Sequence, residues 1–262
     1  MNEQTTNTPK MLSILVRLSG IAGIGLALFA LLAPLGVWAG FWDFRLGFTI
    51  LRMAQPLVLW IIALCVISAI AVFLTGRSRN LDGQGKMLGI TLASTLLAVI
   101  AWYIPNSYLP GEGVTIPPIH DITTDLDNPP EFVAVMPLRG SDSNTTDYGN
   151  WGEMTPERQA AMQREAYPDI VTQTFDEPAD VVFNRALAAA RDQGWEIVAA
   201  EPEEGRIEAT ATTFWFRFKD DVVIRIRESG ETTYLDARST SRVGMSDVGK
   251  NAARLRAFFD AL

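Results

Sequence analysis

The 262-residue sequence has few of the side chains that most often bind metal ions or carry out catalysis. It contains one cysteine, Cys65, and one histidine, His120. A single cysteine excludes an intrachain disulfide and a multi-cysteine metal site, and a single histidine excludes the paired-histidine zinc motifs. We therefore expect the protein to hold no metal ion and no cofactor.

Charge is nearly missing from three long apolar stretches in the first part of the chain. Leu12–Trp38 contains only Arg17, and neither Pro56–Leu74 nor Met87–Ile104 contains any charged residue. Crossing a bilayer takes roughly 17–25 apolar residues, so each stretch is long enough. The first is long for a cleavable signal and two more follow it, so we expect it to be retained. The sequence predicts a three-span transmembrane region over residues 1–104.

The two parts of the chain differ in charge, and this difference predicts an orientation. Residues 1–104 hold seven basic against three acidic residues (+4), and residues 105–262 hold 15 against 27 (−12). A part this acidic is a poor binder of nucleic acid. The basic residues cluster before the first span and in the connector 77–86, which places both on the cytoplasmic side. We expect a bacterial inner-membrane protein with a cytoplasmic N-terminus and a periplasmic C-terminal domain.

The sequence of residues 105–262 predicts an arm followed by a compact domain. Residues 105–166 are rich in Pro, Gly, Asp and Asn, which is typical of an extended arm or linker, with one short helix at 155–166. Residues 167–262 predict an α+β domain, an antiparallel sheet covered by helices in the order β-α-β-β-β-β-α. The expected strands are 171–175, 195–199, 206–213, 222–227 and 233–241, and the expected helices are 178–193 and 247–262. The alternation changes phase between Thr213 and Phe214, which indicates a break or a bulge.

Alternation also predicts a charged face on the sheet. If Val222, Ile224 and Ile226 face the core, then Arg225 and Arg227 face away from it, together with Asp236 and Arg238. We expect cross-strand ion pairs with neighbours such as Glu208 and Asp236, on a face that is exposed to solvent. The alternative is contact with anionic lipid headgroups or with an acidic partner.

Two blocks of sequence resemble a known family. "WFRFKDDVVIRIR…DARSTSRVGMSDVGKNAARLRAF" and the upstream "IHDITTDLDNPPEF" are similar to the family catalogued as domain of unknown function 1499. The resemblance covers roughly residues 167–262 and the arm 119–132. It implies a small membrane-tethered domain of unestablished activity, and it carries over no catalytic residues.

The sequence contains few residues that could form a catalytic or metal site. His120 and Asp121 with Ser239, Ser241 or Ser246 would supply the residue types of a hydrolase. However, "GMSDVG" has one residue too many for a G-x-S-x-G elbow, and it lies in an antiparallel domain. The carboxylates of "HDITTDLD" could hold calcium, but such residues before "NPP" more often form turns. We expect no catalytic residues.

The polar stretch before the last helix is the main binding candidate. Ser246 and Asp247 suit a helix N-terminus, and Asp247, Asn251 and Arg254 form a polar stripe on that helix. Plain capping, an external anion and docking of the chain's own arm all remain open. We favour docking, with Arg242 or Arg254 pairing with Asp121 or Asp125. The full candidate set is His120, Asp121, Thr124, Asp125, Arg238, Ser241, Arg242, Ser246, Asp247, Asn251 and Arg254.

Taken together, these features predict a membrane-anchored periplasmic binding or scaffolding domain without catalysis, an accessory protein of the inner membrane. Its expected partners are the lipid bilayer and a membrane protein. One alternative is an envelope hydrolase that uses His120 with a serine. Another is a lipid-binding module with an apolar groove under the last helix.

Overall fold

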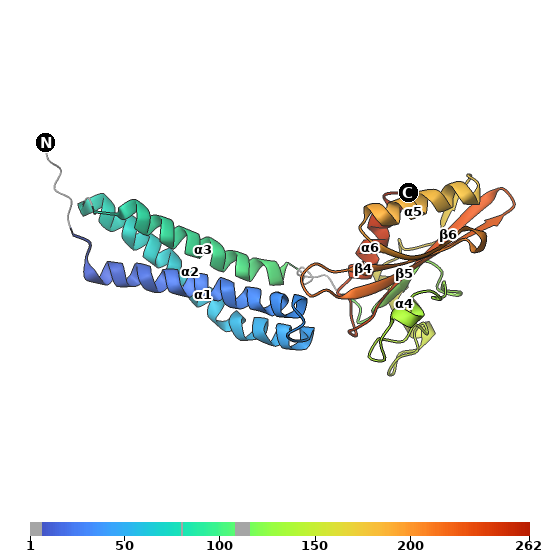
Figure 1. Ribbon diagram of the computed structural model, residues 1–262, viewed down its shortest axis with the longest axis horizontal. Helices are drawn as coiled ribbons and strands as arrows, with labels where there is room; N and C mark the ends of the chain where they lie inside the picture. The colour runs from blue at the N-terminus through green and yellow to red at the C-terminus, as the bar shows by residue number, and fades with distance from the viewer. Residues whose placement is uncertain (1–6, 80, 108–115) are drawn as a thin grey trace. The chain divides into compact units, whose positions relative to one another are not determined.

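The computed structural model describes residues 7–79, 81–107 and 116–262. The chain divides into two compact units, Met1–Leu109 and Pro110–Leu262 (Figure 1). Residues 108–115 of the predicted linker lie outside the described residues. Each unit is considered by itself below.

The first unit is a bundle of three long apolar helices. They are α1 (Lys10–Trp38), α2 (Phe44–Arg79) and α3 (Gln84–Asn106). All three are long and apolar enough to cross a membrane, as the sequence predicted, although α2 begins well before its apolar stretch. A glycine brings α1 close to α3, because a Cβ atom on Gly23 would lie 2.7 Å from the Cβ of Ser94.

The second unit is an antiparallel sheet with helices. Its elements are β1 (Asp121–Thr123), η1 (Met136–Leu138), α4 (Pro156–Ala166), β2 (Gln173–Phe175), α5 (Ala179–Asp192), β3 (Glu196–Glu201), η2 (Pro202–Glu204), β4 (Arg206–Thr212), β5 (Lys219–Ser229), β6 (Thr232–Ser241) and α6 (Lys250–Phe259). The strand order is β1-β6-β5-β4-β3, and β2 also pairs with β6. The α+β class and the predicted element order are confirmed. The extra strand, β1, comes from the arm.

One face of the sheet forms the apolar core. Val222, Ile224 and Ile226 of β5 point into it, as their alternation predicted. Helices α5 and α6 cover this face and contribute buried side chains such as Phe183 and Phe258. Figure 1 shows both helices on the same side of the sheet, and α4 lies along the β1 edge, where Met162 and Ala166 pack against the core. The amphipathic pattern of both helices explains this arrangement, since each buries one stripe.

Strand β1 is held between the edge of the sheet and helix α4. Its residues pair with Arg238–Thr240 of β6. On the other side, the Gln163 amide accepts a hydrogen bond from the Thr123 nitrogen (3.1 Å) and donates one to the Thr123 oxygen (2.6 Å). Gln159 donates to the Asp121 oxygen (3.0 Å). Two glutamines thus satisfy the backbone of an edge strand in the way that a further strand would.

The phase change after Thr213 is a hairpin loop. The Thr213 nitrogen donates to the Phe218 oxygen (2.8 Å), and the Phe218 nitrogen donates to the Thr213 hydroxyl (2.9 Å). The sequence located this break correctly, and the structure shows that the chain reverses direction there.

Candidate functional site

The face of the sheet opposite α5 and α6 is charged, and the arm covers it. One deeply buried pair joins Asp121 of β1 to Arg238 of β6. The Arg238 Nε and Nη2 atoms donate to the two carboxylate oxygens at 2.9 and 2.7 Å, and both side chains are under 5% exposed. Arg238 also donates to the backbone oxygens of Pro130 and Thr146. Burial alone would lower the pKa of Arg238, but the Asp121 carboxylate outweighs it and raises that pKa.

A second cluster surrounds Asp236. Arg225 and Arg227 both donate to its carboxylate, at 2.8 and 2.6 Å, which are the cross-strand ion pairs predicted from sequence. Arg225 also donates to Asp125 of the arm at 3.0 Å. Burial would raise the pKa of Asp236, but the hydrogen bonds from Thr172 and the two arginines lower it overall.

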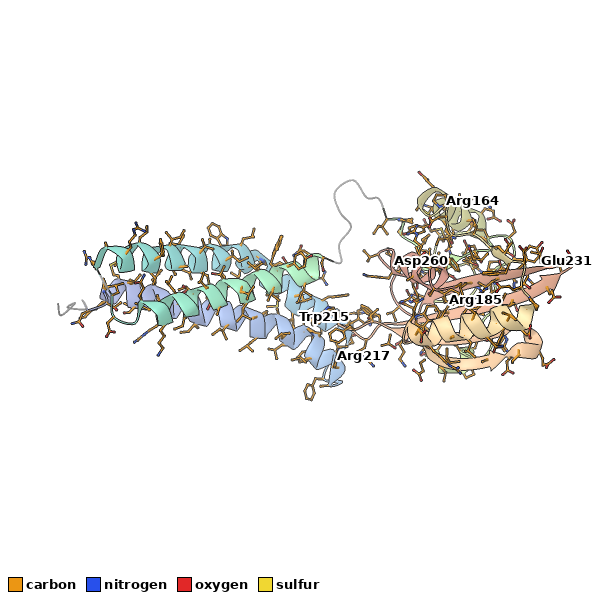
Figure 2. All side chains as sticks on the ribbon, turned by 90° about the horizontal axis from the view of Figure 1, so that it is seen from above. Arg164, Arg185, Trp215, Arg217, Glu231 and Asp260 are labelled. Carbon is orange, nitrogen blue, oxygen red and sulfur yellow. The ribbon has the colours of Figure 1, made fainter. Side chains whose placement is uncertain are left out.

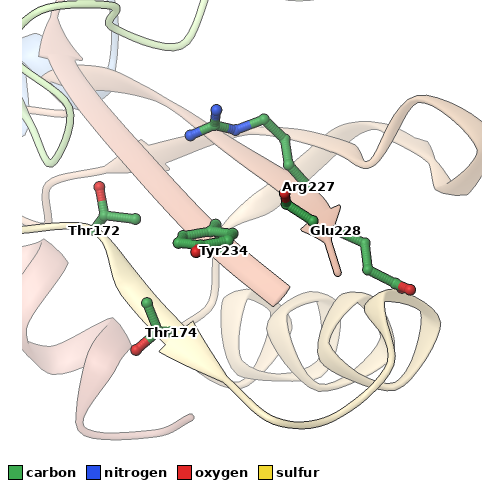
Figure 3. A pocket seen from close by; sticks show the side chains of 6 residues that line it. Thr172, Thr174, Arg227, Glu228 and Tyr234 are labelled. Atoms are coloured by element: carbon green, nitrogen blue, oxygen red, sulfur yellow. The ribbon is translucent and has the colours of Figure 1, made fainter. Parts of the chain in front are cut away.

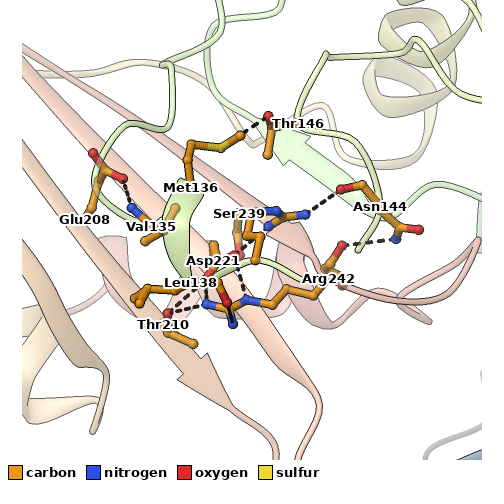
Figure 4. A network of polar contacts seen from close by, with 12 residues as sticks. Val135, Met136, Leu138, Asn144, Thr146, Glu208, Thr210, Asp221, Ser239 and Arg242 are labelled. Carbon is orange, nitrogen blue, oxygen red and sulfur yellow. Dashed lines mark hydrogen bonds and ion pairs between the residues drawn. The ribbon is translucent and has the colours of Figure 1, made fainter. Parts of the chain in front are cut away.

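A third cluster centres on Asp221 (Figure 4). Arg242 donates to both of its carboxylate oxygens, at 2.9 and 2.8 Å, and Arg139 of the arm donates at 2.5 Å. Arg242 also holds the arm directly, because it donates to the Leu138 oxygen at 2.8 Å. The Asn144 amide donates to the Ser241 oxygen at 3.0 Å. Several separate contacts therefore hold the arm to this end of the face.

Glu208, expected as a cross-strand ion-pair partner, pairs instead with Arg206 of its own strand and also holds the arm, a role that the sequence did not predict. Its fully buried carboxylate accepts hydrogen bonds from the backbone nitrogens of Val133, Ala134 and Val135, at 3.0–3.1 Å, and pairs with Arg206. The arm curls around this carboxylate and offers it three successive N–H groups, as in an anion-binding nest. The available signal was a lone acidic residue in the otherwise uncharged segment "IEATAT" of this strand.

On the opposite face, α6 also contacts the arm. The Asn251 amide donates to the His120 oxygen (2.9 Å) and to the Ser241 hydroxyl (3.0 Å). The Ser239 hydroxyl donates to the Asn251 oxygen at 2.7 Å, and Arg254 pairs with Asp220 at 2.5 Å. Asn251 is therefore the residue through which α6 holds the arm.

The connection between β6 and α6 combines capping with docking. The N-cap residue of α6 is Gly249, and the Asp247 carboxylate accepts from the backbone nitrogens of Gly249 (2.8 Å) and Asn251 (2.7 Å), so it satisfies donors at the start of the helix. Its own nitrogen donates to the Ile119 oxygen at 3.3 Å, and the Ser246 hydroxyl donates to the Pro117 oxygen at 3.4 Å. Burial raises the pKa of Asp247, and the hydrogen bonds that it accepts offset this only in part.

The structure therefore brings the arm and the predicted docking region together, but the predicted ion pairs were wrong. Asp121 pairs with Arg238 and Asp125 with Arg225, whereas Arg242 pairs with Asp221 and Arg254 with Asp220. Sheet geometry gives the reason. Asp121 points to the face that carries Arg238, and α6 with Arg254 lies across the sheet on the other face. Thr124, also a candidate, joins the arm to β6 by donating to Asp236 and accepting from the Ala237 nitrogen.

A family model described as a protein of unknown function, DUF1499, matches residues 121–262, which is more than half of the chain. The chain belongs to the DUF1499 family. The resemblance seen in the sequence is thus confirmed. The matched region of this DUF1499 chain starts at the first residue of β1, so it includes the arm as well as the sheet. No curated protein matches the sequence.

His120 lies in the interior of the DUF1499 domain. It is 2% exposed, and its ring lies 5.0 Å from that of Trp151. Burial lowers the pKa of His120, and the Asp121 carboxylate offsets this only in part. Among the described residues, neither ring nitrogen of His120 has a hydrogen-bond partner, serine hydroxyls included. The hydroxyls of Ser239 and Ser246 contact Asn251 and Pro117 instead.

A shallow polar depression lies at one end of the charged face (Figure 3). Its volume is about 510 Å³, and its lining residues are Thr172, Thr174, Arg227, Glu228, Ser229 and Tyr234. Arg227 is the most accessible arginine of the face, with a side chain that is 49% exposed. The alternative of a lipid-binding module needs an apolar groove beneath α6, and this space is packed with Leu255, Phe258 and Trp195.

Proposed function

We propose that this DUF1499 protein is a non-catalytic binding or scaffolding domain, anchored in a bacterial inner membrane and facing the periplasm. One observation carries the proposal. The polar residues that looked most like a reactive site are engaged in holding the arm to the sheet. Asp121 is paired with Arg238, and Asn251 binds the backbone of His120. Such a closed network gives a rigid body rather than an open site for a reaction.

The proposed orientation rests on charge. Lys10 and Arg17 flank the first helix, and Arg77, Arg79 and Lys86 lie around the connector between α2 and α3. Positive residues remain on the cytoplasmic side during insertion. Three spans then carry the chain to the periplasm before the domain begins.

Reporter fusions test the orientation. A periplasmic reporter such as alkaline phosphatase, fused after Leu262, is expected to be active. The same reporter fused after Asp82, in the connector between α2 and α3, is expected to be inactive, and it serves as the matched control. The reverse pattern would reject the periplasmic assignment.

Cross-linking in native membranes tests the binding role. The full-length chain is expected to yield a cross-linked partner in fixed stoichiometry. Charge reversal of Arg227 in the exposed depression is expected to weaken this product, and reversal of Arg191, exposed on α5, is expected to leave it unchanged. Turnover of an envelope substrate by the purified chain, lost in His120→Gln, would contradict the non-catalytic assignment.

A further inference from the structure

The loop between β4 and β5 carries four aromatic side chains and an arginine. Phe214–Phe218 reads Phe-Trp-Phe-Arg-Phe. The two hydrogen bonds between Thr213 and Phe218 close the loop. Within it, the rings of Phe214 and Trp215 meet edge to face at 5.1 Å, and those of Phe216 and Phe218 stack at 6.0 Å. The loop is thus a compact aromatic cluster at the tip of a hairpin.

The register of the sheet places this loop beside the point where the chain joins the domain. Asp121 of β1 lies opposite Thr240 of β6, and Thr240 lies opposite Asp221 of β5. Strands β1 and β5 therefore run in the same direction and start at the same end of the sheet. The residues before Asp121 lead back to α3, and the residues before Asp221 form the aromatic loop.

The connection between β6 and α6 begins at this same end, after Ser241. It presents Met245, which is 72% exposed, and Val248, which is 40% exposed. In the loop, Phe214 is 63% exposed. We call Phe214–Phe218 with Met245 and Val248 the aromatic end of the domain. Large apolar side chains gathered on a surface mark a contact with protein or membrane.

Charge separates the two ends of the sheet. Arg217 and Lys219 are exposed at the aromatic end, together with Glu196 at the start of β3, while nearby Asp220 is buried against Arg254. The opposite end holds the turns β3–β4 and β5–β6, whose exposed acidic residues are Glu201, Glu203, Glu204, Glu228 and Glu231. Figure 2 shows Trp215 and Arg217 at one end of the domain and Glu231 at the other. The second end also carries Arg227, but its exposed acidic residues outnumber its exposed basic residues, so anionic headgroups repel it more than they repel the first end.

Covalent geometry keeps the domain close to the membrane. Asp121 follows the last residue of α3, Asn106, by 15 residues. At 3.3–3.6 Å per residue, these span at most about 50 Å. A tether this short gives the bilayer a high effective concentration around the domain, so that even a weak contact is populated.

We infer that the aromatic end inserts into the interfacial layer of the bilayer that holds α1, α2 and α3. Aromatic rings with an adjacent arginine and lysine have the composition that concentrates at the level of lipid headgroups. Within the domain, the depression at Arg227 lies at the end of the sheet opposite the aromatic end. The inference rests on the membrane anchoring in the proposed function but not on the binding role.

Lipid quenching in the full-length chain tests this contact. Phe214→Cys in a Cys65→Ala background carries an environment-sensitive fluorophore, and Glu231→Cys is the matched control at the opposite end. The chain is reconstituted in nanodiscs of phosphatidylcholine and phosphatidylglycerol. Headgroup-region spin-labelled lipid is expected to quench the label at 214 and to leave the label at 231 bright.

Two outcomes would overturn the inference. A label at 214 that is as water-exposed as the one at 231 places the aromatic end in solvent. A label shielded from water but not quenched by lipid places it against protein. Neither outcome affects the reporter fusions, so failure here is distinguishable from failure of the membrane orientation.

Methionine oxidation of the unsubstituted chain in the same nanodiscs gives a second measurement. Met136 of the arm is 43% exposed and Met245 is 72% exposed. Membrane contact is expected to make Met245 the slower of the two to oxidise. Faster oxidation of Met245, as its greater exposure alone predicts, would contradict the insertion.

Discussion

Individual arginines in this domain bind groups from distant parts of the chain. Arg238 binds a carboxylate, two backbone oxygens and the face of the Phe132 ring at 5.1 Å. A buried charge of this kind is costly to leave unpaired, whereas the pair itself adds modest net stability. Replacing one member of an ion pair that holds the arm should therefore destabilise the domain strongly. Replacing both members should cost less than the sum of the two single replacements.

The pair of Asp121 and Arg238 provides a direct test at this scale. We expect Asp121→Ala and Arg238→Ala each to lower the free energy of unfolding by about 3–5 kcal/mol, because each leaves the other charge buried alone. The double variant should cost less than the sum of the two. Arg256→Ala is the control, since its pair with Asp169 is 43% and 51% exposed. Urea unfolding checks all four, and additive costs would contradict a coupled pair.

The lowered pKa of Asp236 predicts that the stability of the domain depends on pH in the acid range. Its pKa in the folded domain lies below its ordinary value of 3.8, so folding favours its charged form. The stability that it contributes is complete above the unfolded pKa and is lost as the pH falls through the folded pKa. We expect the difference in unfolding free energy between wild type and Asp236→Asn to shrink below pH 3.8. A difference that grows as the pH falls would show that folding favours the protonated form of Asp236 instead. The exposed residue Asp142, replaced by Asn, is the control.

Among the elements, β1 and β2 are the two three-residue strands, and both pair with β6. The residues of β1 depend on β6 on one side and on the glutamines of α4 on the other. A three-residue strand has little stability of its own, so α4 determines whether this edge is protected.

Gln163 is therefore expected to matter more than its helix position suggests. Gln163→Ala removes both hydrogen bonds to Thr123 and leaves a buried backbone pair unsatisfied, at a cost of about 1–3 kcal/mol. The amide of Thr123 should also exchange with solvent faster. Glu165→Ala, exposed on the same helix, is the control. Unchanged exchange at Thr123 would show that β6 alone holds the strand.

At the scale of the whole molecule, the arm belongs to the domain that follows it. Without it, Glu208 loses three backbone donors, and Arg238 and Asp221 lose charged partners. Several buried charges would then lack partners, each at a cost of several kcal/mol.

We expect a fragment of residues 116–262 to unfold cooperatively, and a fragment of residues 155–262 to aggregate or to lack a cooperative transition. Thermal unfolding followed by circular dichroism, with analytical size exclusion, distinguishes the two. Equal melting temperatures for both fragments would show that the arm is dispensable and that the charged face tolerates solvent.

The sequence alone determined the features that depend on local pattern. The long stretches without charged residues predicted three apolar helices. The alternation of apolar and polar residues predicted which side of β5 faces the core, and it predicted the ion pairs of Asp236 with Arg225 and Arg227. These follow from periodicity and from neighbouring strands, which need no knowledge of distant contacts.

Only the tertiary structure decided which distant groups meet. The sequence offered Arg242 and Arg254 as partners for Asp121, and the register of β1 on β6 selected Arg238. It gave no sign that Glu208 would gather three backbone donors. Nor did it show that the aromatic loop and the start of the arm share one end of the sheet. Each of these depends on strand register or on the path of the arm, which bring together residues such as Ala134 with Glu208 and Asp121 with Arg238 that no local pattern relates.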